Sequence, residues 1–167
     1  MDTKFIGELT ELKCQMYCLE QGFIISKPIL DNARYDMLID YNGKIYRVQI
    51  KTSRWMSEDK EGFIFNCKSQ HSVSGGNKIM KYTPEEIDFF MTEFEGKFYL
   101  IPCEKTKSEM RLRFKPTKNN QDHKAYFAKD YEFIEKKLAE LENKKIDSLD
   151  FDKETYNPQN LLRVIFH

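Results

Sequence analysis

The dipeptide Asn42-Gly43 constrains the fold more than any other feature of this 167-residue chain. Asn-Gly is the strongest short-range signal for a β-hairpin, because both central residues of a type I′ turn require positive φ angles. We therefore predict a β-hairpin over residues 34–51. Its second strand alternates apolar and polar side chains, which gives it two different faces: Tyr46, Val48 and Ile50 against Arg47, Gln49 and Lys51.

A two-residue turn also fixes which residues of the two strands face each other. It places Asp36 opposite Gln49 on one face, with Lys51 two residues further along and opposite Arg34. Opposed Cβ atoms in a sheet lie about 4.5–5.5 Å apart. The hairpin is therefore expected to gather a carboxylate, an amide and an ammonium group on one sheet surface. Because opposed like charges are unfavourable, we expect a phosphate or Glu11 between Arg34 and Lys51.

A helix is predicted over residues 4–21, with Gly22 as its C-terminal stop. Glu8 and Glu11 lie on the flank of its apolar stripe, so a carboxylate can stay polar there while the helix packs on a sheet. The alternative role for Glu11 is a salt bridge between helix and strand. The stripe itself is the face expected to pack: Phe5, Leu9, Leu12, Met16 and Leu19.

The rest of the chain gives weaker patterns. A mobile, basic loop with a Gly75-Gly76 hinge is expected at 68–82 and a helical turn begins at Thr83. The other expected elements are strands at 23–25 and 63–67, a hairpin of 89–94 with 97–102, a strand at 110–114, a long loop at 115–129 and a helix at 131–145.

Composition and length predict a folded core at 1–130 and a C-terminal helix and tail, 131–167, that packs on the core or on another subunit. The chain is 40% hydrophobic, which is enough for a packed core. It has neither a signal peptide pattern nor an apolar run near the roughly 20 residues of a membrane helix, so a cytoplasmic, membrane-free protein with four reduced cysteines is expected.

The formal net charge is zero, yet the charges are unevenly distributed. Residues 42–82 carry eight Lys or Arg residues against three acids, whereas residues 131–167 carry six basic residues and eight acidic ones. A basic middle section suits binding to phosphates on one side of the molecule.

The order and spacing of these residues resemble the PD-(D/E)xK nuclease superfamily over roughly residues 4–130. The first helix is similar to that of archaeal Holliday-junction resolvases, and the whole pattern is closer to the homing endonucleases of this superfamily encoded in bacterial group I introns. The motifs that carry the resemblance are Gly7-x3-Glu11-x10-Gly22-Phe23, 32–36 with Asp36, 48–52 with Gln49-x-Lys51, 82–88 and 99–102.

The resemblance implies an α/β (α+β), restriction-endonuclease-like mixed β-sheet flanked by helices. It also implies Mg²⁺-dependent hydrolysis of double-stranded DNA by a homo-oligomer, with an active centre of Glu11, Asp36, Gln49 and Lys51. Two positions depart from the superfamily pattern. Tyr35 stands where proline often precedes the aspartate, and Gln49 stands where a second acid usually lies.

Mg²⁺ prefers hard oxygen ligands and keeps several waters. Asp36 supplies a carboxylate, Gln49 an amide oxygen and Ile50 a backbone carbonyl, while Glu11 would hold a metal-bound water. Mn²⁺ is expected to substitute. Because Gln49 carries no charge, we expect one firmly held metal ion, with Lys51 orienting the attacking water or stabilising the developing negative charge.

The residues expected to contact DNA lie in the first helix, in the hairpin and in the basic segment after it: Glu8, Arg34, Arg47, Arg54, Lys68, Gln70, His71, Lys78 and Lys81. Three other functions remain open from the sequence. These are a Holliday-junction-type nuclease, an inactive nuclease fold that only binds DNA, and an interaction module without a role on DNA.

Overall fold

The computed structural model describes residues 2–30, 32–73, 76–117 and 125–133. The chain divides into two compact units, Met1–Ile134 and Glu135–His167, and only the first is described here. The helix expected at 131–145 therefore lies, from residue 134 onward, outside the described residues. No helix among those described is long and apolar enough to cross a lipid bilayer.

Helix α1 (Thr3–Glu20) begins where the Asp2 carboxylate accepts a hydrogen bond from the Lys4 amide. Its buried positions are Thr10, Cys14, Gln15 and Cys18. Thr10, Cys14 and Cys18 recur every four residues, so they follow one side of the helix. Small side chains there allow the helix backbone to approach the sheet closely.

The prediction that the apolar stripe of α1 packs on the sheet was wrong. The five side chains of the apolar stripe are between 38% and 59% exposed. At 100° per residue, the stripe lies on the side of α1 opposite to Cys14. The periodicity correctly identified a stripe of apolar side chains, but the small residues on the other side pack on the sheet. We call these five residues (5, 9, 12, 16 and 19) the apolar stripe.

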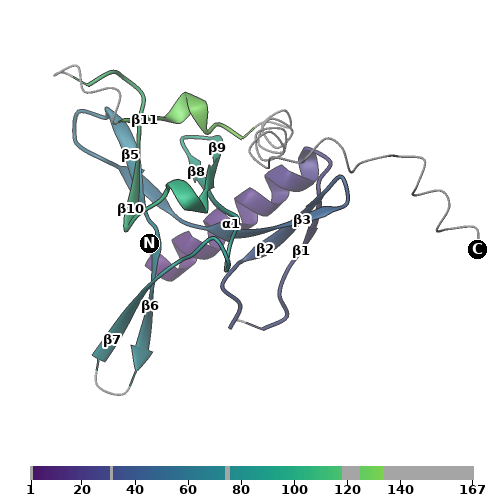
Figure 1. Cartoon of the computed structure of the whole chain (residues 1–167). Coiled ribbons are helices and arrows are strands. Elements are labelled where there is room, and N and C mark those ends of the chain that lie inside the picture. The colour runs from purple at the N-terminus through teal and green to yellow at the C-terminus, as the bar shows by residue number, and fades with distance from the viewer. Residues whose placement is uncertain (1, 31, 74–75, 118–124, 134–167) are drawn as a thin grey trace, which may run out of the picture. The chain divides into compact units, whose positions relative to one another are not determined.

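A five-stranded mixed sheet lies against α1 (Figure 1). Its strand order is β1-β2-β3-β8-β9, in which β3 and β8 run parallel and the other neighbours run antiparallel. The strands are β1 (Ile24–Ser26), β2 (Met37–Tyr41), β3 (Lys44–Ile50), β8 (Phe89–Phe94) and β9 (Lys97–Pro102).

The hairpin of β2 and β3 forms with the expected turn, because Asn42 and Gly43 have φ angles of 52° and 76°. The register runs from Tyr41 opposite Lys44 to Met37 opposite Val48. One detail differs: the paired ladder stops before Asp36, whose backbone amide donates to the carbonyl of Val48 at 2.9 Å. Asp36 therefore meets Gln49 through side chains and not as a ladder pair.

A second sheet has the order β11-β10-β5-β4. Phe63 and Phe65 of this sheet pack with Phe90, Phe94 and Tyr99 of the first sheet in one buried cluster. The long loop expected at 115–129 therefore contains a short strand of this sheet, Tyr126–Phe127. The elements are β4 (Ser53–Trp55), β5 (Gly62–Asn66), β10 (Glu109–Arg113) and β11 (Tyr126–Phe127), with short 3-10 helices at Cys103–Lys105 and Ala128–Asp130.

Residues 68–73 and 76–81 form two paired strands where a loop was expected. Strand β6 (Lys68–Val73) pairs with β7 (Gly76–Lys81), and this arm projects away from the two sheets (Figure 1). The apolar residues of these strands, such as the adjacent Ile79 and Met80, do not alternate with polar ones, which is why the sequence pattern did not indicate strands. Pairing brings Lys68 opposite Lys81 and His71 opposite Lys78.

Candidate active site

The carboxylate of Asp36 lies at the end of β3. Its Oδ2 atom accepts a hydrogen bond from the backbone amide of Ile50 at 2.7 Å and a short one from the side-chain amide of Gln49. The tight turn at 42–43 fixes the register, and the register brings these groups together. The predicted juxtaposition of the acid and the amide is therefore present.

The side chain of Gln49 is 6% exposed and is held between two oxygen atoms. Its Nε2 atom donates to Asp36 and also to the carbonyl oxygen of Ile50, at 3.2 Å. An amide nitrogen thus lies between two of the oxygen atoms that were predicted to bind a cation. If Gln49 is to present Oε1 to a cation, this amide must turn around.

Lys51 leaves the end of β3 beside Tyr82. The Lys51 ammonium donates to the Tyr82 hydroxyl at 3.2 Å and lies 5.0 Å from the centre of its ring. The Lys51 backbone amide donates to the carbonyl of Met91 at 2.9 Å, so β8 fixes the start of this side chain. Within the described residues, no carboxylate forms an ion pair with the Lys51 ammonium.

Glu11 reaches this region from α1. The hydroxyls of Thr10 and Thr52 lie 3.4 Å apart, which joins the helix to the chain just after Lys51. Burial raises the pKa of Glu11, and the negative charge of Asp36 raises it further, whereas Lys27 and Lys51 oppose these effects. Within the described part of the chain, Glu11 forms no ion pair, so the alternative helix–strand salt bridge is not formed there.

Burial also raises the pKa of Asp36, although several neighbours favour its charged form. The Ile50 amide has the largest opposing effect, followed by Lys51, the Gln49 amide and Lys27. Lys27, just after β1, affects both carboxylates, yet no sequence pattern singled it out. The two acids therefore share a partly buried environment in which their negative charges are not fully compensated.

Arg34 does not lie opposite Lys51, contrary to the predicted register. Its guanidinium donates twice to the carboxylate of Glu86, at 3.1 and 3.3 Å, and once to the hydroxyl of Ser69, at 2.7 Å. It also lies over the ring of Tyr82, 4.1 Å from the centre. Arg34 thus connects the base of the arm with the turn after it.

Arg47 makes several hydrogen bonds within the protein. Its guanidinium donates to the Asp88 carboxylate at 3.1 and 3.4 Å and to the carbonyls of Pro84 and Glu85. Its backbone amide donates to the same carboxylate at 2.9 Å. These contacts fasten the middle of β3 to the turn at 83–88.

The other residues expected to contact DNA lie on α1, on β4 and along the arm. Glu8, Arg54 and Lys81 are exposed, and Lys68 is half-buried. Gln70, His71 and Lys78 belong to the paired strands of the arm. Tyr82, which touches both Lys51 and Arg34, was given no role from the sequence. The available signal was its place at the start of the 82–88 motif, which carries part of the family resemblance.

Comparison with known families decides the identity of the fold. The family model for PD-(D/E)XK endonucleases matches residues 1–134. The chain belongs to this family. It is accordingly a nuclease by family, and its fold is restriction-endonuclease-like.

A solved structure of similar fold is that of a bacterial homing endonuclease, I-Ssp6803I. It shares 22% identity with this PD-(D/E)XK endonuclease, at a TM-score of 0.65, and the match covers 90% of this chain and 99% of the other. At this level of identity the likeness shows the fold alone. A comparison with curated proteins finds no match.

The donor atoms of this PD-(D/E)XK site fit a hard divalent cation. No group of three His, Cys, Asp or Glu residues suited to a metal occurs in the described ranges. The available ligands are two carboxylates, of Asp36 and Glu11, with the carbonyl of Ile50 and the amide oxygen of Gln49. All are oxygen atoms, which Mg²⁺ and Ca²⁺ accept and which softer metals do not prefer.

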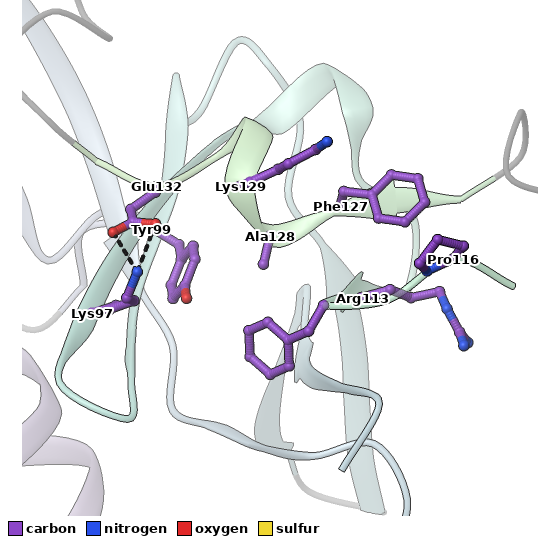
Figure 2. A pocket seen from close by; sticks show the side chains of 9 residues that line it. Lys97, Tyr99, Arg113, Pro116, Phe127, Ala128, Lys129 and Glu132 are labelled. Atoms are coloured by element: carbon purple, nitrogen blue, oxygen red, sulfur yellow. Dashed lines mark hydrogen bonds and ion pairs between the residues drawn. The ribbon is translucent and has the colours of Figure 1, made fainter. Parts of the chain in front are cut away.

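Two hollows on the described surface lie away from this site. The smaller, about 440 Å³, is lined partly by Tyr99, Arg113 and Phe127, and the Lys97–Glu132 ion pair closes one side (Figure 2). The larger, about 830 Å³, lies beside β10. Neither contains Glu11, Asp36, Gln49 or Lys51, so the candidate site does not coincide with either hollow.

Proposed function

We propose that this PD-(D/E)XK protein is a metal-dependent, site-specific endonuclease that hydrolyses phosphodiester bonds of double-stranded DNA, of the homing endonuclease type. The proposal rests on one observation: the carboxylate of Asp36 meets Gln49 and Ile50 at the end of β3, where the strand leads into Lys51. Two neighbouring carboxylates with raised pKa values and little compensating charge are a site to which a cation would bind favourably.

Each residue of the site has a proposed role. Asp36, Glu11 and the carbonyl of Ile50 would hold Mg²⁺, together with Gln49 once its amide oxygen is turned toward the ion. A divalent cation bound there supplies polarisation of the phosphate and a lowered pKa of water. Lys51 would donate to the negative charge that develops on the phosphate. With only two carboxylates, we propose one firmly held ion.

The arm formed by β6 and β7 supports double-stranded DNA as the substrate. A two-stranded β-ribbon fits the major groove of B-DNA, and the register of the arm begins with Lys68 opposite Lys81 and includes Lys78 opposite His71 three pairs further along. Such lysines would contact phosphates, which positions the DNA without reading its sequence. Arg54 on β4 and Glu8 on α1 remain proposed contacts, whereas the internal bonds of Arg47 leave it little capacity to bind DNA.

We also propose that the protein acts as a homo-oligomer and that the apolar stripe of α1 packs against a second copy. Its five side chains alternate at spacings of four and three residues, which is the seam pattern of paired helices. Helix α1 is about 27 Å long by its 18 residues. A specific interface needs about 800 Å² from each partner, and the neighbouring strand β1, where Ile24 is 68% exposed, offers additional surface.

The oligomer can be tested by the mass of the full chain in solution. Wild type is expected to sediment as a dimer or larger, Leu12→Glu to dissociate, and the control Ile45→Glu, at an exposed position of β3, to keep the wild-type mass. A monomeric wild type, or a Leu12→Glu variant with unchanged mass, would contradict the proposal. If the chain's own tail covers the stripe, the wild type will be monomeric.

A second candidate function is DNA binding without cleavage. The observation that favours it is the orientation of Gln49, whose amide nitrogen and not its oxygen faces Asp36. In that case the protein would bind duplex DNA with or without Mg²⁺ and cleave nothing.

The deciding experiment is cleavage of a library of linear duplexes, with a branched junction as a parallel substrate. We expect cleavage at a defined duplex sequence with Mg²⁺ or Mn²⁺ and none with a chelator. Binding without cleavage would support the second candidate. Cleavage of the junction alone would indicate a Holliday-junction-type nuclease, and neither binding nor cleavage would overturn a role on DNA.

A further inference from the structure

Tyr82 lies between the candidate catalytic lysine and the base of the arm. Its hydroxyl accepts the hydrogen bond of the Lys51 ammonium, 3.2 Å away. Its ring stands edge-on to the buried ring of Phe90, with the centres 5.3 Å apart. Because Phe90 belongs to β8 and is fully buried, the core fixes the ring of Tyr82, and the hydroxyl has a defined place.

The Lys51 ammonium has a neutral hydrogen-bond partner and not a carboxylate. A carboxylate at this distance would hold the ammonium and also neutralise much of its charge. A phenol hydroxyl holds the ammonium by a hydrogen bond and leaves the positive charge available for a phosphate. A lysine side chain is flexible, and a small misplacement of a reacting group can reduce a rate by about 100-fold. A neutral, rigid acceptor therefore suits a lysine that must act on an anion.

Arg34 connects the same tyrosine to the arm. Its guanidinium lies over the Tyr82 ring and donates to the Ser69 hydroxyl in β6 and, at 2.9 Å, to the Lys81 carbonyl at the end of β7. The bidentate contact with Glu86 fixes the orientation of the guanidinium plane. One side chain thus touches both strands of the arm and the residue that holds Lys51.

We propose that Tyr82 is a positioning residue for Lys51, and that Arg34 links this tyrosine to the base of the arm. The expected effect on the cleavage rate rests on the proposed nuclease function. The arrangement of the three side chains does not depend on that function. When the arm binds DNA, the Arg34–Tyr82 contact would hold the ammonium where the phosphate arrives.

The first test compares Tyr82→Phe with Tyr41→Phe, a matched loss of a hydroxyl at a tyrosine of β2 that packs on Phe23. At saturating DNA and Mg²⁺, we expect the single-turnover cleavage rate of Tyr82→Phe to fall about 10-fold, with unchanged affinity for DNA. Tyr41→Phe should cleave like wild type. A wild-type rate for Tyr82→Phe would overturn the positioning role.

A second readout needs neither metal nor cleavage. Lysines of the full chain are dimethylated with a ¹³C label, which keeps one N–H donor, and the Lys51 signal is assigned with Lys51→Arg. We expect this signal to shift in Tyr82→Phe and, by a smaller amount, in Ser69→Ala, but not in Tyr41→Phe. An unmoved signal in Tyr82→Phe would refute the contact, and an unmoved signal in Ser69→Ala would refute the link to the arm.

The two readouts separate this inference from the proposed function. If the wild type cleaves no DNA but the Lys51 signal moves as expected, the nuclease proposal fails and the positioning contact stands. If the wild type cleaves and neither the rate nor the signal changes in Tyr82→Phe, the positioning proposal alone fails.

Discussion

Charged side chains have charged partners in the middle of β3 but neutral partners at its end. In the middle of the strand, the Arg47 guanidinium is shared between the Asp88 carboxylate and two backbone carbonyls. At its end, the carboxylate of Asp36 receives neutral amide donors, and the Lys51 ammonium donates to a phenol hydroxyl. The first set of charges is neutralised within the fold, and the second set is not.

Charges that are paired within the protein stabilise the fold, whereas charges without such a partner are available to bind a ligand. Partly buried ions are stable in a fold when they are paired and hydrogen-bonded, as Arg47 and Asp88 are. Burial raises the pKa values of Asp36 and Glu11 because their pairing is incomplete. Such an imbalance marks candidate functional sites, and here it coincides with the residues that the family resemblance implies are the active centre.

The largest expected effect comes from removing the ammonium at the end of β3. Lys51→Ala should reduce the single-turnover cleavage rate by about 10²–10³-fold, the usual effect of losing a group that stabilises developing charge. Its melting temperature and DNA affinity should stay near those of wild type. Lys44→Ala, at the exposed start of the same strand, is the matched control. A Lys51→Ala variant that cleaves normally would remove Lys51 from the chemistry.

Breaking the pair in the middle of β3 should act on stability instead. Arg47→Met should lower the free energy of unfolding by about 1–3 kcal/mol, because Asp88 loses charged hydrogen bonds while partly buried. The control is Arg111→Met, whose ion pair with Glu109 is largely exposed and should contribute under about 1 kcal/mol. Denaturant titration measures both. Equal effects would mean that the Arg47 contacts are no more structural than a surface pair.

Asp36→Asn should produce a smaller effect, a gain of stability in the metal-free protein. Because the folded pKa of Asp36 is raised, the folded state binds its proton more tightly than the unfolded state does. Ionised Asp36 therefore costs stability at neutral pH, and this cost disappears as pH falls through the folded pKa. The melting temperature of Asp36→Asn should exceed that of wild type by a few degrees at pH 7.5, and the gain should shrink in acid.

A lower melting temperature for Asp36→Asn than for wild type at pH 7.5 would contradict this prediction. It would show that the hydrogen bonds from Ile50 and Gln49 outweigh the cost of burying the charge. Gln49→Ala, which removes one of these donors, would then be destabilising as well.

The parts of the fold that follow from local chemistry could be predicted from the sequence. The Asn42-Gly43 turn fixed the register of β2 and β3, and the Asp36 carboxylate contacts the Gln49 amide beyond the end of that ladder. Lys51 follows β3, and its ammonium donates to Tyr82. The buried face of α1 could not be predicted in this way. Close packing through Thr10, Cys14 and Cys18 decided it, and a hydrophobic periodicity does not reveal which face has the better fit.

Contacts between distant segments could not be predicted from the sequence either. Arg47 contacts Asp88, and Arg34 contacts Ser69 and Glu86, only once the sheet has formed. The arm was missed for a different reason. Its strands carry no alternation of apolar and polar residues, so their sequence resembles that of a loop.

The most direct test of a cation site at the end of β3 is the melting temperature of wild type and Asp36→Asn as Mg²⁺ is added, without DNA. We expect Mg²⁺ to stabilise wild type progressively, by about 2.7 kcal/mol at 100 times the dissociation constant. We expect little or no shift for Asp36→Asn, so the metal reverses the order of stability of the two proteins. Equal shifts for the two proteins, or none for wild type, would contradict a cation site at Asp36.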